Sequence, residues 1–139
     1  LWGTRPMPDD MRLVIAETAI DALSYAALKG IAQTRLVSIA GQMKPEQPDL
    51  ISSATEKLPS GGRVVSAMDR DDAGNALTAR VEQVFDELGR GDIAFTDDRP
   101  ETPGTDWNDE LRSLPPQYHG PKPDREDEET RALFSSSGV

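Results

Sequence analysis

Apolar residues in this chain fall into short continuous runs that alternate with longer amphipathic segments. Runs typical of buried strands occupy residues 12–17, 36–40, 63–68 and 93–96. Segments with helical periodicity occupy residues 18–29, 50–58 and 73–88. Because strands that alternate with helices are typical of βαβ units, we expect an α/β fold, a Rossmann-like open parallel sheet of four strands flanked by helices.

The first predicted helix has a recognisable apolar face. It opens near Thr18, and Gly30 marks its end. Its shared apolar face comprises Ile20, Leu23, Ala27 and Leu28. We expect this face to be the buried one.

The composition divides the chain into three parts. Residues 1–11 are predicted to form an N-terminal arm or linker, residues 12–114 a single domain, and residues 115–139 a polar, mostly irregular C-terminal tail. The domain is expected to end with a short helix over residues 106–114. Because the chain begins with Leu1 rather than Met, we interpret it as a piece of a longer polypeptide or as a trimmed chain.

The charge balance argues against one class of function. With 25 acidic and 15 basic residues among 139, the formal net charge is −10, which disfavours tight, non-specific binding to a phosphate backbone. The absence of cysteine excludes disulfides and thiolate metal sites. No apolar run approaches the roughly 20 residues needed to span a bilayer, so we expect a soluble protein with no membrane partner.

Acidic side chains follow two of the predicted strands directly. Glu17 ends the first apolar run, and Asp69 and Asp71 come immediately after the third. The carboxyl ends of strands in an open α/β sheet are the edge at which ligands bind. Carboxylates there can be aimed at one hard cation such as Mg²⁺, which takes one or two protein carboxylates beside a phosphate. Arg70, between the two aspartates, is the basic residue best placed to meet that phosphate.

Several of these acids also have an ordinary structural interpretation. Asp21 lies three residues after Thr18, close to a capping-box pattern, and Asp109 has the same spacing from Asp106. Asp72 is expected to be the N-cap of the helix over residues 73–88. Both interpretations remain open for Asp21 and Asp106.

Three segments together resemble a known family. They are Leu13-Val-Ile-Ala-Glu17-Thr-Ala-Ile-Asp21, Met68-Asp69-Arg-Asp71-Asp-Ala-Gly74 and Asp106-Trp-Asn-Asp109. In order and spacing they resemble the Toprim domain of primases, topoisomerases and related nucleases, in particular the primase-like Toprim domains of plasmid and phage proteins. The resemblance covers roughly residues 12–114. Asn108 departs from it, since that position is often a second aspartate.

The resemblance implies a role for each acidic residue. Glu17 would be the general acid/base of nucleotidyl or phosphoryl transfer, and Asp69 and Asp71 would coordinate Mg²⁺ or Mn²⁺. Asp21 and Asp106 would extend the acidic surface towards a second metal ion. The implied partners are DNA or RNA and a nucleotide substrate, met in the cytoplasm with the help of flanking domains.

Other functions compete with primer synthesis. The same fold is compatible with metal-dependent cleavage of nucleic acid, or with a non-catalytic module that binds a metal or a partner in a plasmid replication or transfer assembly. A response-regulator receiver domain expects an acidic pair after the first strand, whereas Thr18 follows Glu17. A Rossmann dinucleotide site expects a glycine-rich turn there, which the sequence lacks.

Overall fold

The computed structural model describes residues 1–40 and 43–114. In chain order its elements are β1 (Trp2–Gly3), β2 (Arg12–Ala16), α1 (Ala19–Lys29), β3 (Thr34–Ser38), α2 (Gln47–Glu56), β4 (Arg63–Ala67), α3 (Asp72–Leu88), β5 (Ala94–Asp97) and α4 (Trp107–Arg112). The tail predicted for residues 115–139 lies outside the described residues. No helix within residues 1–40 and 43–114 has the length and apolar character needed to cross a bilayer.

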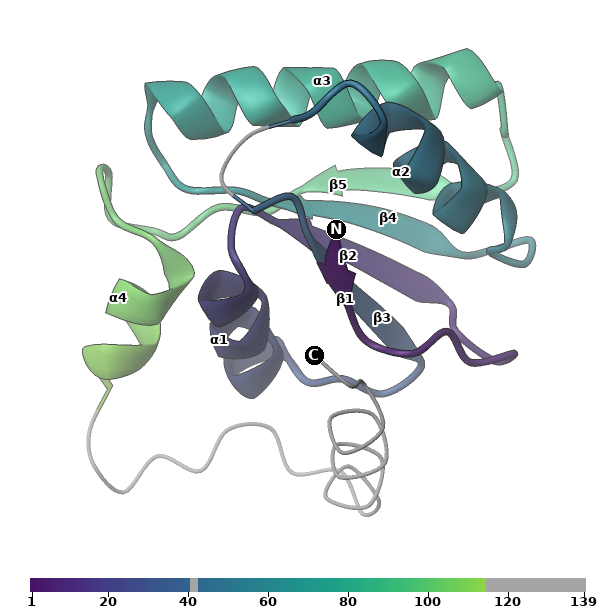
Figure 1. The fold of residues 1–139 in the computed structure, drawn as a ribbon. Coiled ribbons are helices and arrows are strands. Elements are labelled where there is room, and N and C mark those ends of the chain that lie inside the picture. The colour runs from purple at the N-terminus through teal and green to yellow at the C-terminus, as the bar shows by residue number, and fades with distance from the viewer. Residues whose placement is uncertain (41–42, 115–139) are drawn as a thin grey trace.

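The strands form one sheet in the order β1-β3-β2-β4-β5 (Figure 1). Strands β3, β2, β4 and β5 are mutually parallel, which confirms the predicted parallel α/β sheet. The central strand β2 pairs with β4 so that Ala16 lies opposite Ala67. This register brings the residues that follow both strands to the same edge of the sheet.

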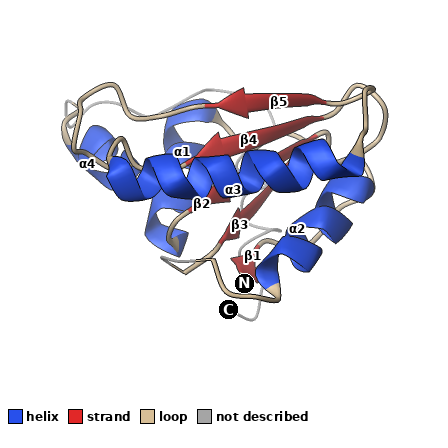
Figure 2. Ribbon diagram, turned by 90° about the horizontal axis from the view of Figure 1, so that it is seen from above, coloured by secondary structure: helices blue, strands red, loops and turns tan. Residues whose placement is uncertain are grey.

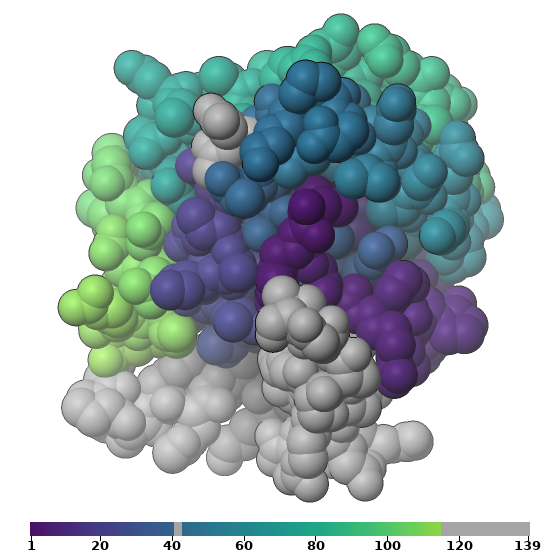
Figure 3. All heavy atoms as spheres, in the orientation of Figure 1, coloured from purple at the N-terminus to yellow at the C-terminus, as the bar shows by residue number. Residues whose placement is uncertain are grey.

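The N-terminal arm contributes a fifth strand, which the sequence did not indicate. Trp2 and Gly3 pair antiparallel with Ser38 and Val37 of β3, and the following Thr4 is buried. The pairing engages backbone groups on the outer side of β3 that would otherwise need water. Figure 3 shows these first residues, in purple, on the front of the molecule between α1 and α2.

Helices cover both faces of the sheet, and each face has its own apolar core (Figures 1 and 2). Helices α2 and α3 pack on the face that contains Ile15, Val37 and Val64. Helices α1 and α4 pack on the face that contains Val14 and Leu36. The alternation of side chains along each strand, which point to opposite faces in turn, separates the two cores.

The predicted buried face of α1 is wrong. Ile20 is 61% exposed and Leu23 38% exposed, whereas Ala22 and Ala26 are buried with Tyr25. The small alanine side chains let the helix approach the sheet, and the ring of Tyr25 meets that of Trp107 in α4 edge-on, with 4.8 Å between centroids. Contact with α4, a distant part of the sequence, therefore decides which face is buried.

Several boundaries differ from those expected. The second predicted strand, residues 36–40, is Thr34–Ser38, because Thr34 and Arg35 pair with Arg12 and Leu13 of β2. The helix predicted over residues 50–58 is Gln47–Glu56. Both elements begin and end earlier than their apolar residues indicated, because backbone hydrogen bonding and not side-chain polarity sets the ends of strands and helices.

Candidate functional site

Glu17 and Asp69 lie side by side at the C-terminal edge of the sheet. They follow β2 and β4, whose last residues, Ala16 and Ala67, are paired. The backbone N–H of Asp69 donates a hydrogen bond of 3.1 Å to Oε1 of Glu17. Glu17 is only 8% exposed. A buried carboxylate that accepts a backbone N–H is held in one orientation, and here it faces the Asp69 segment.

Asp71 combines two roles in this geometry. It is the N-cap of α3, with its Oδ1 accepting a 2.7 Å hydrogen bond from the N–H of Gly74. The predicted cap, Asp72, is instead in the first turn of the helix, so that prediction was wrong by one residue. Because capping uses one carboxylate oxygen of Asp71, the second is available to a ligand.

Gly74 allows α3 to begin directly against the strand end. A Cβ atom at this position would lie 1.9 Å from the backbone oxygen of Asp69, a distance at which no side chain fits. The absence of a side chain at Gly74 thus brings the start of α3 close to the Asp69 backbone.

Asp21 and Asp106 lie at the starts of α1 and α4. Asp21 is buried in the first turn of α1, where its Oδ2 accepts a 3.0 Å hydrogen bond from the hydroxyl of Thr18. Its Oδ1 accepts the N–H of Asn108 at 3.4 Å, which ties α1 to α4. Asp106 is the N-cap of α4 and forms a capping box with Asp109, as one interpretation of the sequence proposed.

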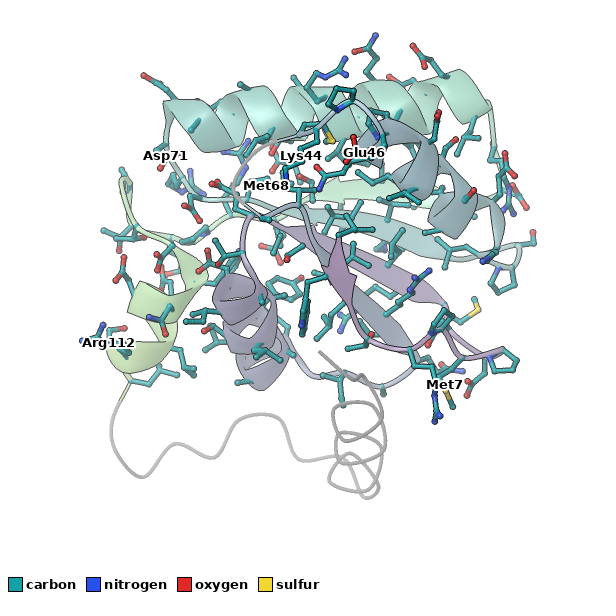
Figure 4. All side chains as sticks on the ribbon, in the orientation of Figure 1. Met7, Lys44, Glu46, Met68, Asp71 and Arg112 are labelled. Atoms are coloured by element: carbon teal, nitrogen blue, oxygen red, sulfur yellow. The ribbon has the colours of Figure 1, made fainter. Side chains whose placement is uncertain are left out.

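These five acids form two overlapping clusters. Carboxylate oxygens of Glu17, Asp69 and Asp71 all lie within 4.8 Å of one another, and so do those of Asp21, Asp69 and Asp106. Asp69 belongs to both clusters. In Figure 4, Asp71 lies beside the start of α3, on the side of the molecule where α4 lies.

The polar atoms of Asp69 fit a bound cation. Its Oδ1 is buried and has no hydrogen-bond partner among the described residues. An orphaned buried carboxylate oxygen is costly unless a ligand satisfies it. Hard oxygen donors that converge in this way suit Mg²⁺ or Mn²⁺. The donor set at this edge therefore fits a divalent metal ion.

The electrostatics of the two clusters also favour a bound cation. Burial, together with the charges of Glu17, Asp21 and Asp106 and then that of Asp71, raises the pKa of Asp69 to about 7. Burial first, and neighbouring aspartates second, also raise the pKa values of Glu17 and Asp21. Carboxylates that resist ionisation together are stabilised when a cation binds between them.

Arg70, the predicted substrate contact, lies exposed at the rim of this site. Its Nε donates to the carbonyl of Pro100, and its backbone N–H donates to the carbonyl of Thr105 at 3.2 Å. These contacts attach the β4–α3 connection to the loop that leads into α4. Arg70 forms no ion pair with an acid of either cluster among the described residues.

Arg99 also supports the site, through contacts that no motif in the sequence predicted. Its guanidinium pairs with Asp97 at 2.6 Å and donates to the side chain of Asn75 at 2.7 Å and to the backbone oxygen of Asp69 at 3.2 Å. It thereby links the end of β5 to the strand end that carries Asp69. Asp98, the other acid there, accepts a 2.8 Å hydrogen bond from the hydroxyl of Tyr25 and belongs to neither cluster.

The family follows from a comparison that covers most of the domain. A sequence family described as Toprim-like matches residues 14–111, a span that contains all five acids of the two clusters. The chain belongs to the Toprim-like family. No curated protein and no solved structure matches it.

Membership of the Toprim-like family agrees with the geometry of the site. The family suggests metal-dependent activity on nucleic acid, and the acidic clusters can hold a metal ion. Toprim domains are often found in enzymes that process nucleic acid. The family and the site geometry therefore agree on metal-dependent activity on nucleic acid.

Proposed function

We propose that this Toprim-like chain is the catalytic domain of a primase-like protein, which transfers nucleotides onto nucleic acid with Mg²⁺ or Mn²⁺. The observation that carries the proposal is Asp69, whose carboxylate is shared by both acidic clusters and has a buried oxygen without a partner. The primase-like spacing of Glu17 and Asp21 favours nucleotide transfer within the wider family.

Each acid has a defined part in this mechanism. Asp69 and Asp71 would hold one cation, and Asp21 and Asp106 would join Asp69 around a second. When bound, such cations stabilise the negative charge that develops on the attacking and leaving oxygens of a phosphoryl transfer. Asp71 and Asp106 each use one oxygen as a helix cap, so the helix termini fix their orientation.

Glu17 acts as the general base. Because its Oε1 accepts the N–H of Asp69, its Oε2 is the atom that takes the proton from the attacking hydroxyl group. Burial raises the pKa of Glu17 and so makes it a better proton acceptor than a solvated glutamate. Arg70, exposed at the rim, meets a phosphate of the incoming nucleotide or of the strand.

Flanking domains would supply most of the affinity for nucleic acid. The net charge of −10 repels a phosphate backbone, and the clustered acids add to this repulsion locally. A bound cation makes the local charge favourable to a phosphate only at the metal site itself. Catalysis by this domain therefore requires a nucleic acid that is brought to the rim by other parts of the protein.

The first experiment measures cation binding before activity. Mn²⁺ is titrated into the chain by water-proton relaxation, and the parent is compared with Glu17→Gln and with an Asp69→Asn/Asp71→Asn double variant. Glu82→Gln, an exposed acid on α3, is the matched control. We expect saturable binding in the parent and control, and its loss in the double variant with unchanged circular dichroism.

The reaction itself is then identified by its products. The chain, joined to its flanking domains, is given single-stranded DNA with nucleotides, and primer synthesis is measured beside cleavage. Primer synthesis that Glu17→Gln abolishes supports the proposal. Cleavage without synthesis would replace it with a Toprim nuclease, and absence of Mn²⁺ binding in the parent would replace it with a non-catalytic module.

A further inference from the structure

A separate pocket lies at the opposite, N-terminal edge of the sheet. Its walls come from the turn after β1, the starts of β2 and β3, and the end of α2, and it has a volume of about 250 Å³. The residues that matter for its chemistry are Met7, Asp10, Leu13, Arg35, Lys57 and Leu58. Figure 4 places Met7 on the opposite side of the molecule from Asp71 and the acidic site.

Arg35 is unusual for its position in β3. It shares a strand face with Val37 and Ile39, both of which are buried in the core under α2 and α3. Its register partner on β2 is Leu13, another core residue. A charged side chain on a strand face that is otherwise buried and apolar lowers the stability of the fold unless an opposite charge or a hydrogen bond compensates it.

Arg35 has neither a hydrogen bond at its buried Nε nor an ion pair among the described residues. The charge of Asp10 raises the pKa of Arg35, yet burial outweighs this effect and lowers the pKa overall. The carboxylate of Asp10 is itself engaged, since its Oδ2 accepts the N–H of Met7 at 2.9 Å.

The lining has one positive charge in excess. Arg35 and Lys57 are cations and Asp10 is an anion, so a single negative charge on a ligand neutralises the pocket. The remaining walls are apolar, with Leu13 and Leu58 buried in the core. A free phosphate, which carries more charge and holds its water strongly, matches these walls poorly.

We propose that this pocket binds a carboxylate carried on an aliphatic group. The carboxylate pairs with the guanidinium of Arg35 in a charge-assisted hydrogen bond. The aliphatic group lies against Leu13, Leu58 and the Met7 side chain. Such a ligand is either a small branched-chain acid or the C-terminal residue of a polypeptide, because both present the same chemistry.

The turn that closes the pocket is well suited to hold a ligand. Met7 and Asp10 are joined by two hydrogen bonds, from N–H of Met7 to the Asp10 carboxylate and from N–H of Asp10 to the Met7 carbonyl at 3.2 Å. Pro6 and Pro8 restrict the backbone on both sides of Met7. The wall is therefore formed before the ligand arrives, which lowers the entropic cost of binding.

The test uses the whole 139-residue chain without metal, so that its outcome is independent of the acidic site. N-acetyl-leucine is titrated and followed by backbone amide signals in two-dimensional NMR. Its carboxamide, which has the same shape without charge, and inorganic phosphate are titrated in parallel. We expect saturable shifts around Arg35 and Leu58 and binding of the carboxamide weaker by about tenfold or more, as loss of a charged hydrogen bond implies.

Two variants connect binding to the pocket. Arg35→Gln should abolish it, whereas Arg80→Gln, on the exposed surface of α3, should leave it unchanged. Ala54→Leu fills the pocket from α2 and keeps the charge of Arg35, so it tests the site even where Arg35→Gln does not fold. Equal binding of acid and carboxamide, tighter binding of phosphate, or unchanged binding in either pocket variant would overturn the proposal.

A second comparison identifies the source of the ligand. A short peptide that ends in leucine is titrated as the free acid and as the C-terminal amide. Tighter binding of the peptide acid than of N-acetyl-leucine assigns the pocket to a chain terminus. The reverse order assigns it to a small acid.

Discussion

The backbone N–H of Asp69 donates to Oε1 of Glu17, and this bond joins the ends of two neighbouring parallel strands. It places the proposed general base beside the carboxylate shared by both acidic clusters. A side-chain to backbone bond between residues 52 positions apart exists only when β2 and β4 are adjacent. The sheet order is therefore a precondition of the site.

Substitution of Asp69 should affect cation binding more than substitution of Asp71. Asp69 belongs to both clusters, so Asp69→Asn should weaken Mn²⁺ binding at both of them, whereas Asp71→Asn should weaken it at one. Asn also serves as an N-cap, so Asp71→Asn should leave α3 stable within about 0.5 kcal/mol. The measurement is Mn²⁺ stoichiometry by relaxation titration, beside urea unfolding. Equal loss in both single variants would argue against a shared ligand.

The metal-free protein should become less stable as pH rises from about 5 to 8. The folded-state pKa of Asp69 is raised to about 7, above its ordinary value of 3.8, so the folded state binds more protons than the unfolded state in this window. Stability is thus present at low pH and is lost as pH rises through 7. Because Asp69 is partly exposed, we expect solvent to reduce the effect to a few degrees in Tm.

Thermal unfolding in EDTA at several pH values checks this dependence. Asp69→Asn should flatten the profile, and Mg²⁺ should restore the parent's Tm at pH 8, where the carboxylates are charged. Glu17 and Asp21 contribute with the same sign, because their pKa values are also raised. A parent Tm that rises between pH 5 and 8 would contradict the assigned origin of the shift.

Replacement of Gly74 by alanine should damage both folding and the site. The new Cβ would clash with the backbone oxygen of Asp69, so α3 or the strand end must move. We expect a loss of about 1–3 kcal/mol in the free energy of unfolding, typical of overpacking, and weaker Mn²⁺ binding. Gly91→Ala is the matched control, since a Cβ there meets nothing within 4 Å. Equal stability of the two variants would show that α3 does not depend on this contact.

Removal of the Tyr25 hydroxyl should loosen the contact between α1 and the segment after β5 without affecting Glu17. Tyr25→Phe keeps the edge-on contact with Trp107 but loses the hydrogen bond to Asp98. We expect a destabilisation of about 1 kcal/mol, as is typical of one hydrogen bond, measured by urea unfolding. Mn²⁺ binding at Asp69 and Asp71 should persist. Complete loss of Mn²⁺ binding would mean that the Tyr25–Asp98 contact and the metal site are coupled more tightly than the contacts between them suggest.

The sequence alone determined the class of fold and the acidic edge. Apolar runs and helical periodicity predicted the parallel sheet. The two patterns can be told apart within a short stretch of sequence, because buried strands are short continuous apolar runs and helices repeat apolar residues every three to four positions. Glu17 and Asp69 were recognisable because each lies at the end of an apolar run. Acidic residues are rare in buried strands, so their presence there indicates a function. The capping pattern of Asp106 and Asp109 was likewise visible locally and is present in the structure.

The tertiary structure alone decided which of these residues meet. The position of β2 between β3 and β4, the pairing of Trp2 with Ser38, and the burial of Tyr25 instead of Ile20 all depend on contacts between distant segments. Local patterns contain no information on such contacts, since a strand or helix can satisfy its own periodicity in several arrangements. The shared carboxylate of Asp69 and the buried Nε of Arg35, which has no hydrogen-bond partner among the described residues, became visible only once packing had placed their neighbours.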